Sequence, residues 1–175
     1  MTIAISLTDA DVFTALRTFL VAVLPAGTEI VQSQDNAVPM PAGAFVAMNN
    51  IGAKRLATNS DGYTPGSVNP GSMAITTPTQ YTMQLDFYGP SAASWAMTVQ
   101  SLFRDDFGVA QFPATVQPLY ADDPVQMPLI TGEEQWLQRW RLSAVMQIDP
   151  TLTAPQDFAG ALAIGLTEVT TKYPA

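Results

Sequence analysis

The sequence predicts a single α+β (α/β) domain, in which two main helices pack on one face of a mixed, mainly antiparallel sheet. Three observations support this prediction. The chain has 175 residues, a usual size for one domain, and 47% of them are apolar, enough for a hydrophobic core. Two segments show apolar residues at helical spacing. Several other segments alternate between apolar and polar residues, which is typical of half-buried strands.

The clearest helix is expected at residues 8–24. Its apolar residues recur every three or four positions and form one continuous face, made of Val12, Phe13, Leu16, Phe19, Leu20, Val23 and Leu24. Thr8 is suited to cap the N-terminus, and Asp9 and Asp11 follow in the first turn, where the helix dipole favours negative charge. Pro25 and Gly27 then stop the helix. This helix is expected to pack on the sheet.

Strands are expected to follow at residues 29–33, 44–49 and 79–88. The last of these alternates regularly and predicts one buried face, made of Tyr81, Met83, Leu85 and Phe87, and one polar face, made of Thr82, Gln84 and Asp86. A Gly-Pro-Ser turn at residues 89–91 leads into a second helix, with inward residues Trp95, Val99, Leu102 and Phe103. Residues 104–111 are compatible with a further short helical turn.

The longest strand is predicted at residues 134–148, with Trp136, Trp140, Leu142, Ala144, Met146 and Ile148 on one side. At ~3.3 Å per residue it would exceed roughly 40 Å, so it is expected to bend or to project beyond the sheet. Residues 50–78 are rich in Gly, Ser, Asn, Thr and Pro and are interpreted as a long loop; such loops are functional, disordered, or hairpins that the pattern hides. Residues 1–150 are expected to form the domain and residues 151–175 a C-terminal arm, which folds back or reaches a neighbouring subunit.

The composition excludes several classes of chemistry. The chain has no His and no Cys, which removes Ser-His-Asp and Cys-His catalysis and all imidazole and thiolate metal sites. No nucleotide-binding glycine motif is present, because residues 52–55 lack the P-loop spacing. The formal charge of −8 argues against a nucleic-acid-binding surface. No signal peptide or membrane-spanning run is recognised. We therefore expect neither an enzyme nor a cofactor, a metal site or a membrane partner.

Three pairs of adjacent carboxylates are candidate chemical sites: Asp105–Asp106, Asp122–Asp123 and Glu133–Glu134. Adjacent strand residues point to opposite faces, and each pair lies beside turn-forming residues, so solvated surface carboxylates are the favoured interpretation. A hydrolase using Asp105, Asp106 or Asp122 is the alternative, and it requires a concave site with a raised carboxyl pKa. The three tryptophans are interpreted as core residues rather than as a ligand-stacking platform or an interface hot spot.

Several phrases of the sequence resemble those of the neck or tail-terminator proteins of tailed phages and prophages. These phrases occur in the same order and cover most of residues 8–160, at 11–17, 23–27, 34–36, 55–59, 78–86, 102–106, 119–124 and 139–140. None of them is a catalytic signature. The resemblance implies a virion structural protein with a small α/β fold, whose hairpins and termini reach adjacent subunits.

The resemblance further implies a homo-oligomeric ring, commonly a hexamer, at the head-proximal end of the tail. Such a ring caps the tail tube, meets the sheath and joins the tail to the head connector, after assembly in the cytoplasm of the host bacterium. DNA would pass through its lumen without specific binding. Another head–tail connector or a sheath-end adaptor is the alternative within the same class. The expected subunit and partner contacts are Asp35, Lys54, Arg55, Arg104, Asp105, Asp106, Asp122 and Asp123. For Lys54 and Arg55, an acidic neighbour and ordinary solvation both stay open.

Overall fold

A six-stranded sheet forms the centre of the computed structural model, which describes residues 3–34, 41–67, 70–130, 136–159 and 165. Its strands lie in the order β2 (Glu29–Gln32), β3 (Phe45–Arg55), β6 (Thr79–Tyr88), β11 (Arg139–Ile148) and β7 (Val116–Ala121), with β8 (Val125–Gln126) also paired to β11. Only the β2–β3 pair is parallel; the others in this sheet are antiparallel. The predicted mixed, mainly antiparallel sheet is confirmed.

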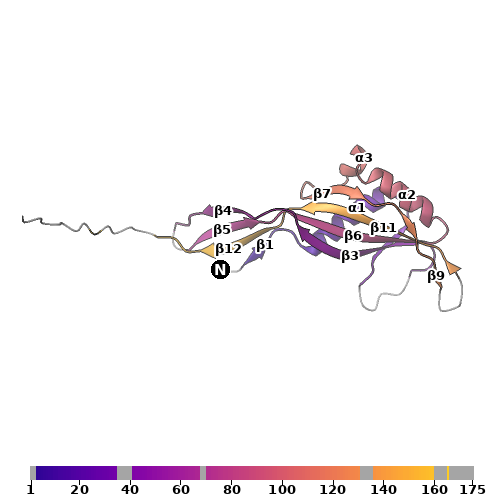
Figure 1. Ribbon diagram of the computed structural model, residues 1–175, viewed down its shortest axis with the longest axis horizontal. Coiled ribbons are helices and arrows are strands. Elements are labelled where there is room, and N and C mark those ends of the chain that lie inside the picture. The colour runs from indigo at the N-terminus through magenta and orange to yellow at the C-terminus, as the bar shows by residue number, and fades with distance from the viewer. Residues whose placement is uncertain (1–2, 35–40, 68–69, 131–135, 160–164, 166–175) are drawn as a thin grey trace, which may run out of the picture.

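Two helices, α1 (Asp9–Val23) and α2 (Ala92–Leu102), cover one face of this sheet, and the short α3 (Asp106–Val109) follows α2 (Figure 1). The first helix begins as the sequence predicts. The Asp11 carboxylate accepts hydrogen bonds from the backbone N–H and the hydroxyl of Thr8, both at 2.7 Å. These bonds hold the pKa of Asp11 below its usual value.

The core lies between the helices and the sheet. Its largest fully buried side chains come from α1, β6, β11 and the end of α2: Leu16, Phe19, Leu20, Met83, Leu85, Phe87, Phe103, Leu142 and Met146. The Phe19 ring meets the Phe103 ring edge-on, with centroids 5.5 Å apart, and stacks on Phe112 at 5.1 Å. Met83, Leu85 and Phe87 of β6 are buried in this core, as the alternation at residues 79–88 predicts. The prediction of a polar second face is wrong at the end of the strand, where Asp86 and Tyr88 are also buried, Tyr88 in a second cluster with Phe45 and Ala47.

A second, four-stranded sheet projects from this body in the order β1 (Ala4–Ile5), β12 (Thr151–Gln156), β5 (Gly71–Thr76) and β4 (Ser60–Thr64) (Figure 1). We call it the arm sheet. It continues the main sheet, because β3 runs into β4, β5 into β6 and β11 into β12. Two backbone hydrogen bonds link the segments where the strands pass from the main sheet to the arm sheet. They run from the Leu56 N–H to the Pro78 carbonyl and from the Thr77 N–H to the Pro150 carbonyl.

The prediction of a long loop at residues 50–78 is wrong in its main part. Residues 50–55 belong to β3, and β4 and β5 form a hairpin, the third of the interpretations that the composition allowed. Of the described arm-sheet residues only Gly71 is buried, and none belongs to a hydrophobic cluster. Because the described residues bury neither face of the arm sheet, its strands have no need of alternating apolar residues.

The long strand near the C-terminus is present but interrupted. It consists of β10 (Trp136–Leu137), which pairs with β9 (Leu129–Ile130), and of β11, with a break at Gln138. Residues 151–156, the start of the predicted C-terminal arm, form β12, antiparallel to β5 and β1. A domain boundary at residue 150 stays a prediction.

Candidate functional site

The charged doublet Lys54–Arg55 lies at the end of β3, where both side chains are exposed. The sequence placed it on a mobile loop, and the structure corrects this, because Lys54 pairs with Gln80 and Arg55 with Thr79 on β6. The doublet therefore stands on a strand beside the base of the arm sheet. Exposed Ile51 and Leu56 flank it, at 44% and 45% exposure.

Asp122 and Asp123 lie in the turn between β7 and β8 and are exposed. The Asp122 N–H donates to the Ser143 carbonyl of β11 at 2.9 Å, and Asp123 accepts a hydrogen bond from Gln100 of α2 at 2.8 Å. Both line an open groove of about 480 Å³. The other lining residues are Val125, Gln126, Met127, Arg141 and Ser143. We call this the acidic groove.

The third predicted cluster, Arg104–Asp105–Asp106, is exposed and spans the turn after α2 and the first residue of α3. Asp105 caps α3, since its carboxylate accepts the Phe107 N–H at 3.2 Å. Asp105, Asp106 and Asp122 thus lie on two separate turns, and one of them is used as a cap. Within the described ranges, no group of three or more acidic side chains is arranged to hold a metal ion. Asp35, the remaining predicted contact, lies outside the described residues.

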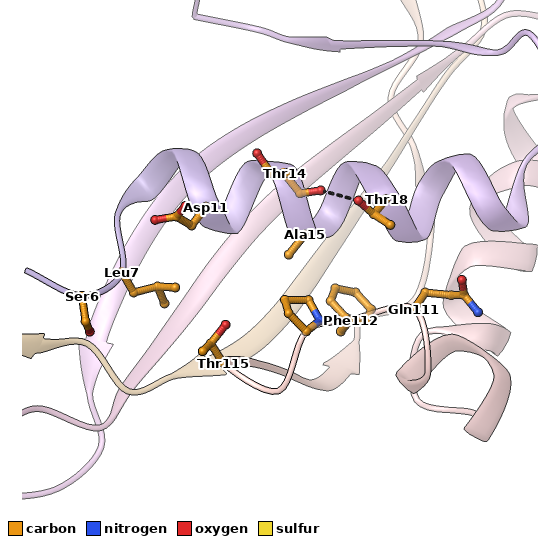
Figure 2. A pocket seen from close by; sticks show the side chains of 10 residues that line it. Ser6, Leu7, Asp11, Thr14, Ala15, Thr18, Gln111, Phe112 and Thr115 are labelled. Atoms are coloured by element: carbon orange, nitrogen blue, oxygen red, sulfur yellow. Dashed lines mark hydrogen bonds between the residues drawn. The ribbon is translucent and has the colours of Figure 1, made fainter.

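A second open groove, of about 630 Å³, lies between α1 and residues 111–115 (Figure 2). Figure 2 shows Phe112 directed toward Ala15, while Thr14 and Thr18 lie along the helix. The Thr18 hydroxyl donates a hydrogen bond to the Thr14 carbonyl at 2.9 Å. Asp11 is the one carboxylate among the residues that line the groove, and it already caps the helix. Because the Thr18 hydroxyl and the Asp11 carboxylate already form hydrogen bonds within or at the end of the helix, neither is an evident reactive group in this groove.

The main sheet carries an ion pair that sequence reasoning missed. On the face away from the helices, Arg139 donates from Nε to Asp86 Oδ1 at 3.0 Å and from Nη2 to Asp86 Oδ2 at 2.9 Å. Asp86 is 5% exposed and accepts a third hydrogen bond from Gln84 at 2.7 Å. The hydrogen bonds that Arg139 donates to Asp86 raise the pKa of Arg139 above its usual value. The alternation of residues 79–88 predicts that Asp86 lies on the polar face of its strand, but it does not predict that Arg139 is its partner.

A second polar cluster joins α1 to the base of the arm sheet. The Asp9 carboxylate accepts hydrogen bonds from the Tyr81 hydroxyl and from the Asn50 amide, the latter at 2.9 Å. Partial burial and the neighbouring Asp9 raise the pKa of Tyr81 to about 12. Asn50 stands at a β-bulge in β3, where its side-chain Oδ1 accepts a hydrogen bond from the Gly52 N–H at 3.0 Å. This cluster fixes α1 against the strands where they leave the main sheet.

The tryptophans divide into two groups. Trp95 and Trp140 are partly buried and pack against the core, as the sequence predicts. Trp136 is 73% exposed and lies directly across from Ile130, itself 56% exposed, in the β9–β10 hairpin. The interpretation of Trp136 as a core residue is therefore wrong: it lies past the edge of the sheet, where no helix covers it.

The fold is a helix-covered sheet with charged turns at its edges and an arm sheet that projects from it. The chain belongs to the phage neck terminator protein family, whose model matches residues 10–171. This is a family of structural proteins of the phage tail. The resemblance inferred from the sequence is confirmed. None of the helices in the described ranges has the length and apolarity needed to span a bilayer.

The fold is also similar to a solved structure, the PVC sheath/tube terminator of an extracellular contractile injection system in its extended state. The two chains are 15% identical and superpose with a TM-score of 0.60, over 95% of this chain. The match spans 65% of the length of the solved chain. At this identity the likeness shows the fold alone. The comparison with curated proteins gives no match.

Proposed function

We propose that this protein terminates the tail of a phage by forming a closed homo-oligomeric ring, a hexamer, at the head-proximal end of the tail tube. The ring caps the tube, meets the end of a sheath where one is present, and offers its other side to the head connector. The observation that carries this proposal, together with the family, is the arm sheet. Its four strands project beyond the helix-covered body and have no core of their own.

An uncovered sheet of this kind gains stability when another layer or chain covers it. The chain supplies no such layer within the described residues, whereas a neighbouring subunit or the tube can supply one. The structural neighbour is a sheath/tube terminator by its title, which supports the same assignment. The proposed interface residues fit this arrangement, because Lys54, Arg55, Arg104 and the acidic groove are all on the surface.

The charge of the chain suits a passage for DNA. Each copy brings a formal charge of −8, so a ring of copies carries a strongly negative total and repels the phosphate backbone. DNA would therefore pass through the lumen without specific binding. The virion is the expected site of the protein, with assembly in the host cytoplasm.

The test is the native mass of the purified protein over a concentration series, with electron micrographs of the same samples. Closed rings with one fixed number of subunits are expected. A strict monomer at every concentration, both alone and after addition of tail tubes, would contradict the ring. Rings with a subunit number other than six would correct the stoichiometry only.

A further inference from the structure

Two oppositely charged doublets stand at opposite edges of the main sheet. On one side, β2 pairs only with Phe45–Met48, so the second half of β3 is an edge that carries Lys54 and Arg55. On the other side, β7 and β8 both pair with β11, and the turn between them carries Asp122 and Asp123. Strands β6 and β11 lie between the two edges.

The basic edge has no acidic partner among the residues that the structure describes. The ion pair present there is Arg139–Asp86, and neither Lys54 nor Arg55 takes part in it. The edge also exposes apolar surface at Ile51 and Leu56. It therefore combines two free cations with two apolar side chains on a strand that is open on one side.

The acidic groove offers the complementary features. Asp122 and Asp123 stand beside Val125 and Met127, which are 57% and 39% exposed and form apolar walls. Arg141 also lines the groove, and its charge offsets one of the two carboxylates. The groove keeps a net negative charge, and its concave, partly apolar shape can receive a long cationic side chain with its methylene groups.

The two surfaces cannot meet within one chain, because two strands separate them. At ~4.8 Å between neighbouring strands, the edges lie roughly 14 Å apart across the sheet alone. A head-to-tail ring joins one patch of each subunit to a different patch of the next. Opposite edges of one sheet, with opposite charge, meet this requirement.

We propose that the acidic groove of one copy receives the Lys54–Arg55 edge of the next copy. This inference rests on the ring proposed above and names the contact that closes it. Exposed charge pairs add little affinity individually but fix register and speed encounter. The contact therefore sets the direction in which copies join, while the apolar side chains around it contribute burial. Assembly should weaken as salt concentration rises.

Charge reversal with rescue tests this contact. Lys54→Glu/Arg55→Glu and Asp122→Lys/Asp123→Lys should each raise the concentration at which half of the chains are in rings, by about tenfold or more. The fourfold variant keeps the formal charge at −8 and should return this concentration to within about threefold of the parent value. Glu29→Lys/Asp149→Lys makes the same charge change as the aspartate variant at exposed sites away from the groove, and should leave assembly unchanged.

A cross-linking measurement keeps the test independent of folding effects. Because the chain has no cysteine, Arg55→Cys/Asp122→Cys introduces the only two thiols. A short bismaleimide should link this variant into a ladder that ends at the ring number. Each single variant should give dimers at most, and Arg104→Cys/Arg55→Cys should give no ladder.

The outcomes separate this contact from the ring itself. Rings in the parent protein, together with unchanged assembly of both reversal variants and no ladder, would overturn the groove contact and leave the ring standing. A parent protein that never assembles would overturn both. Loss of assembly in the two reversal variants without recovery in the fourfold variant would also count against the contact.

Discussion

Arg139 and Asp86 are joined by two parallel hydrogen bonds, of 3.0 and 2.9 Å, on the sheet face opposite α1 and α2. The two residues are 53 positions apart in the sequence and stand on neighbouring strands. The side chain of Asp86 is 7% exposed and that of Arg139 is 24% exposed, so the pair is largely shielded from water. This pair ties β11 to β6 at the end of the sheet that carries the β9–β10 hairpin.

Removing Arg139 should leave a buried carboxylate without its counterion. We expect Arg139→Ala to lower the free energy of unfolding by about 2–4 kcal/mol, measured by urea denaturation. Arg104→Ala, at an exposed turn, serves as the matched control and should change it by less than about 0.5 kcal/mol. Equal effects of the two substitutions would show that the ion pair does not contribute as described.

Tyr81 should make stability depend on alkaline pH. Its pKa is raised from 10.0 to about 12 in the folded chain, so the folded state holds this proton more tightly than the unfolded state. The contribution is fully present below pH 10 and is lost as pH rises from 10 toward 12. Urea denaturation at pH 9 to 12 should therefore show a smaller alkaline loss of stability for Tyr81→Phe than for the parent. Curves with the same slope would contradict the Tyr81–Asp9 contact.

Gly108 should tolerate no side chain. A Cβ at this position would lie 1.8 Å from the Leu102 carbonyl oxygen, a backbone atom that cannot turn away. We expect Gly108→Ala to cost at least about 1–3 kcal/mol of folding free energy. Gly52 has nothing within 4 Å of the same added atom, and Gly52→Ala should cost less than roughly 0.5 kcal/mol. Thermal unfolding of both variants gives the comparison.

Trp136 should dominate the quenching of fluorescence. It is 73% exposed, whereas Trp95 and Trp140 pack against the core. Acrylamide should quench the parent strongly, and Trp136→Phe should remove most of the quenchable emission. Emission that stays equally quenchable after this substitution would mean that the hairpin folds onto the body. Trp140→Phe is the control, and it should leave the quenchable fraction in place.

The sequence predicts those helices and strands in which burial of one face leaves a periodic pattern of apolar residues. Residues 79–88 form β6 because Met83, Leu85 and Phe87 must face the helices, and this requirement appears as alternation. Helix α1 was equally clear, since its apolar face and its Thr8 cap are local features. The sequence misses the arm sheet because β4 is exposed throughout and β5 is mostly half-buried, so no apolar period marks either strand.

The candidate site was predicted only as a set of charged residues. The sequence predicts Lys54, Arg55, Asp122 and Asp123 as surface contacts, which stays a prediction. Their placement at opposite edges of the sheet depends on the pairing of β3, β6 and β11. Such pairing joins segments far apart in the chain, and residue spacing does not reveal it. For the same reason, the sequence does not predict the ion pair between Asp86 and Arg139.

The most direct test of the central claim is the position of the protein in the virion, measured by electron microscopy of particles that carry a labelled chain. We predict a single ring per particle, at the junction between the last tube layer and the head connector. Label at the distal tip, or spread along the whole tail, would contradict a role in tail termination.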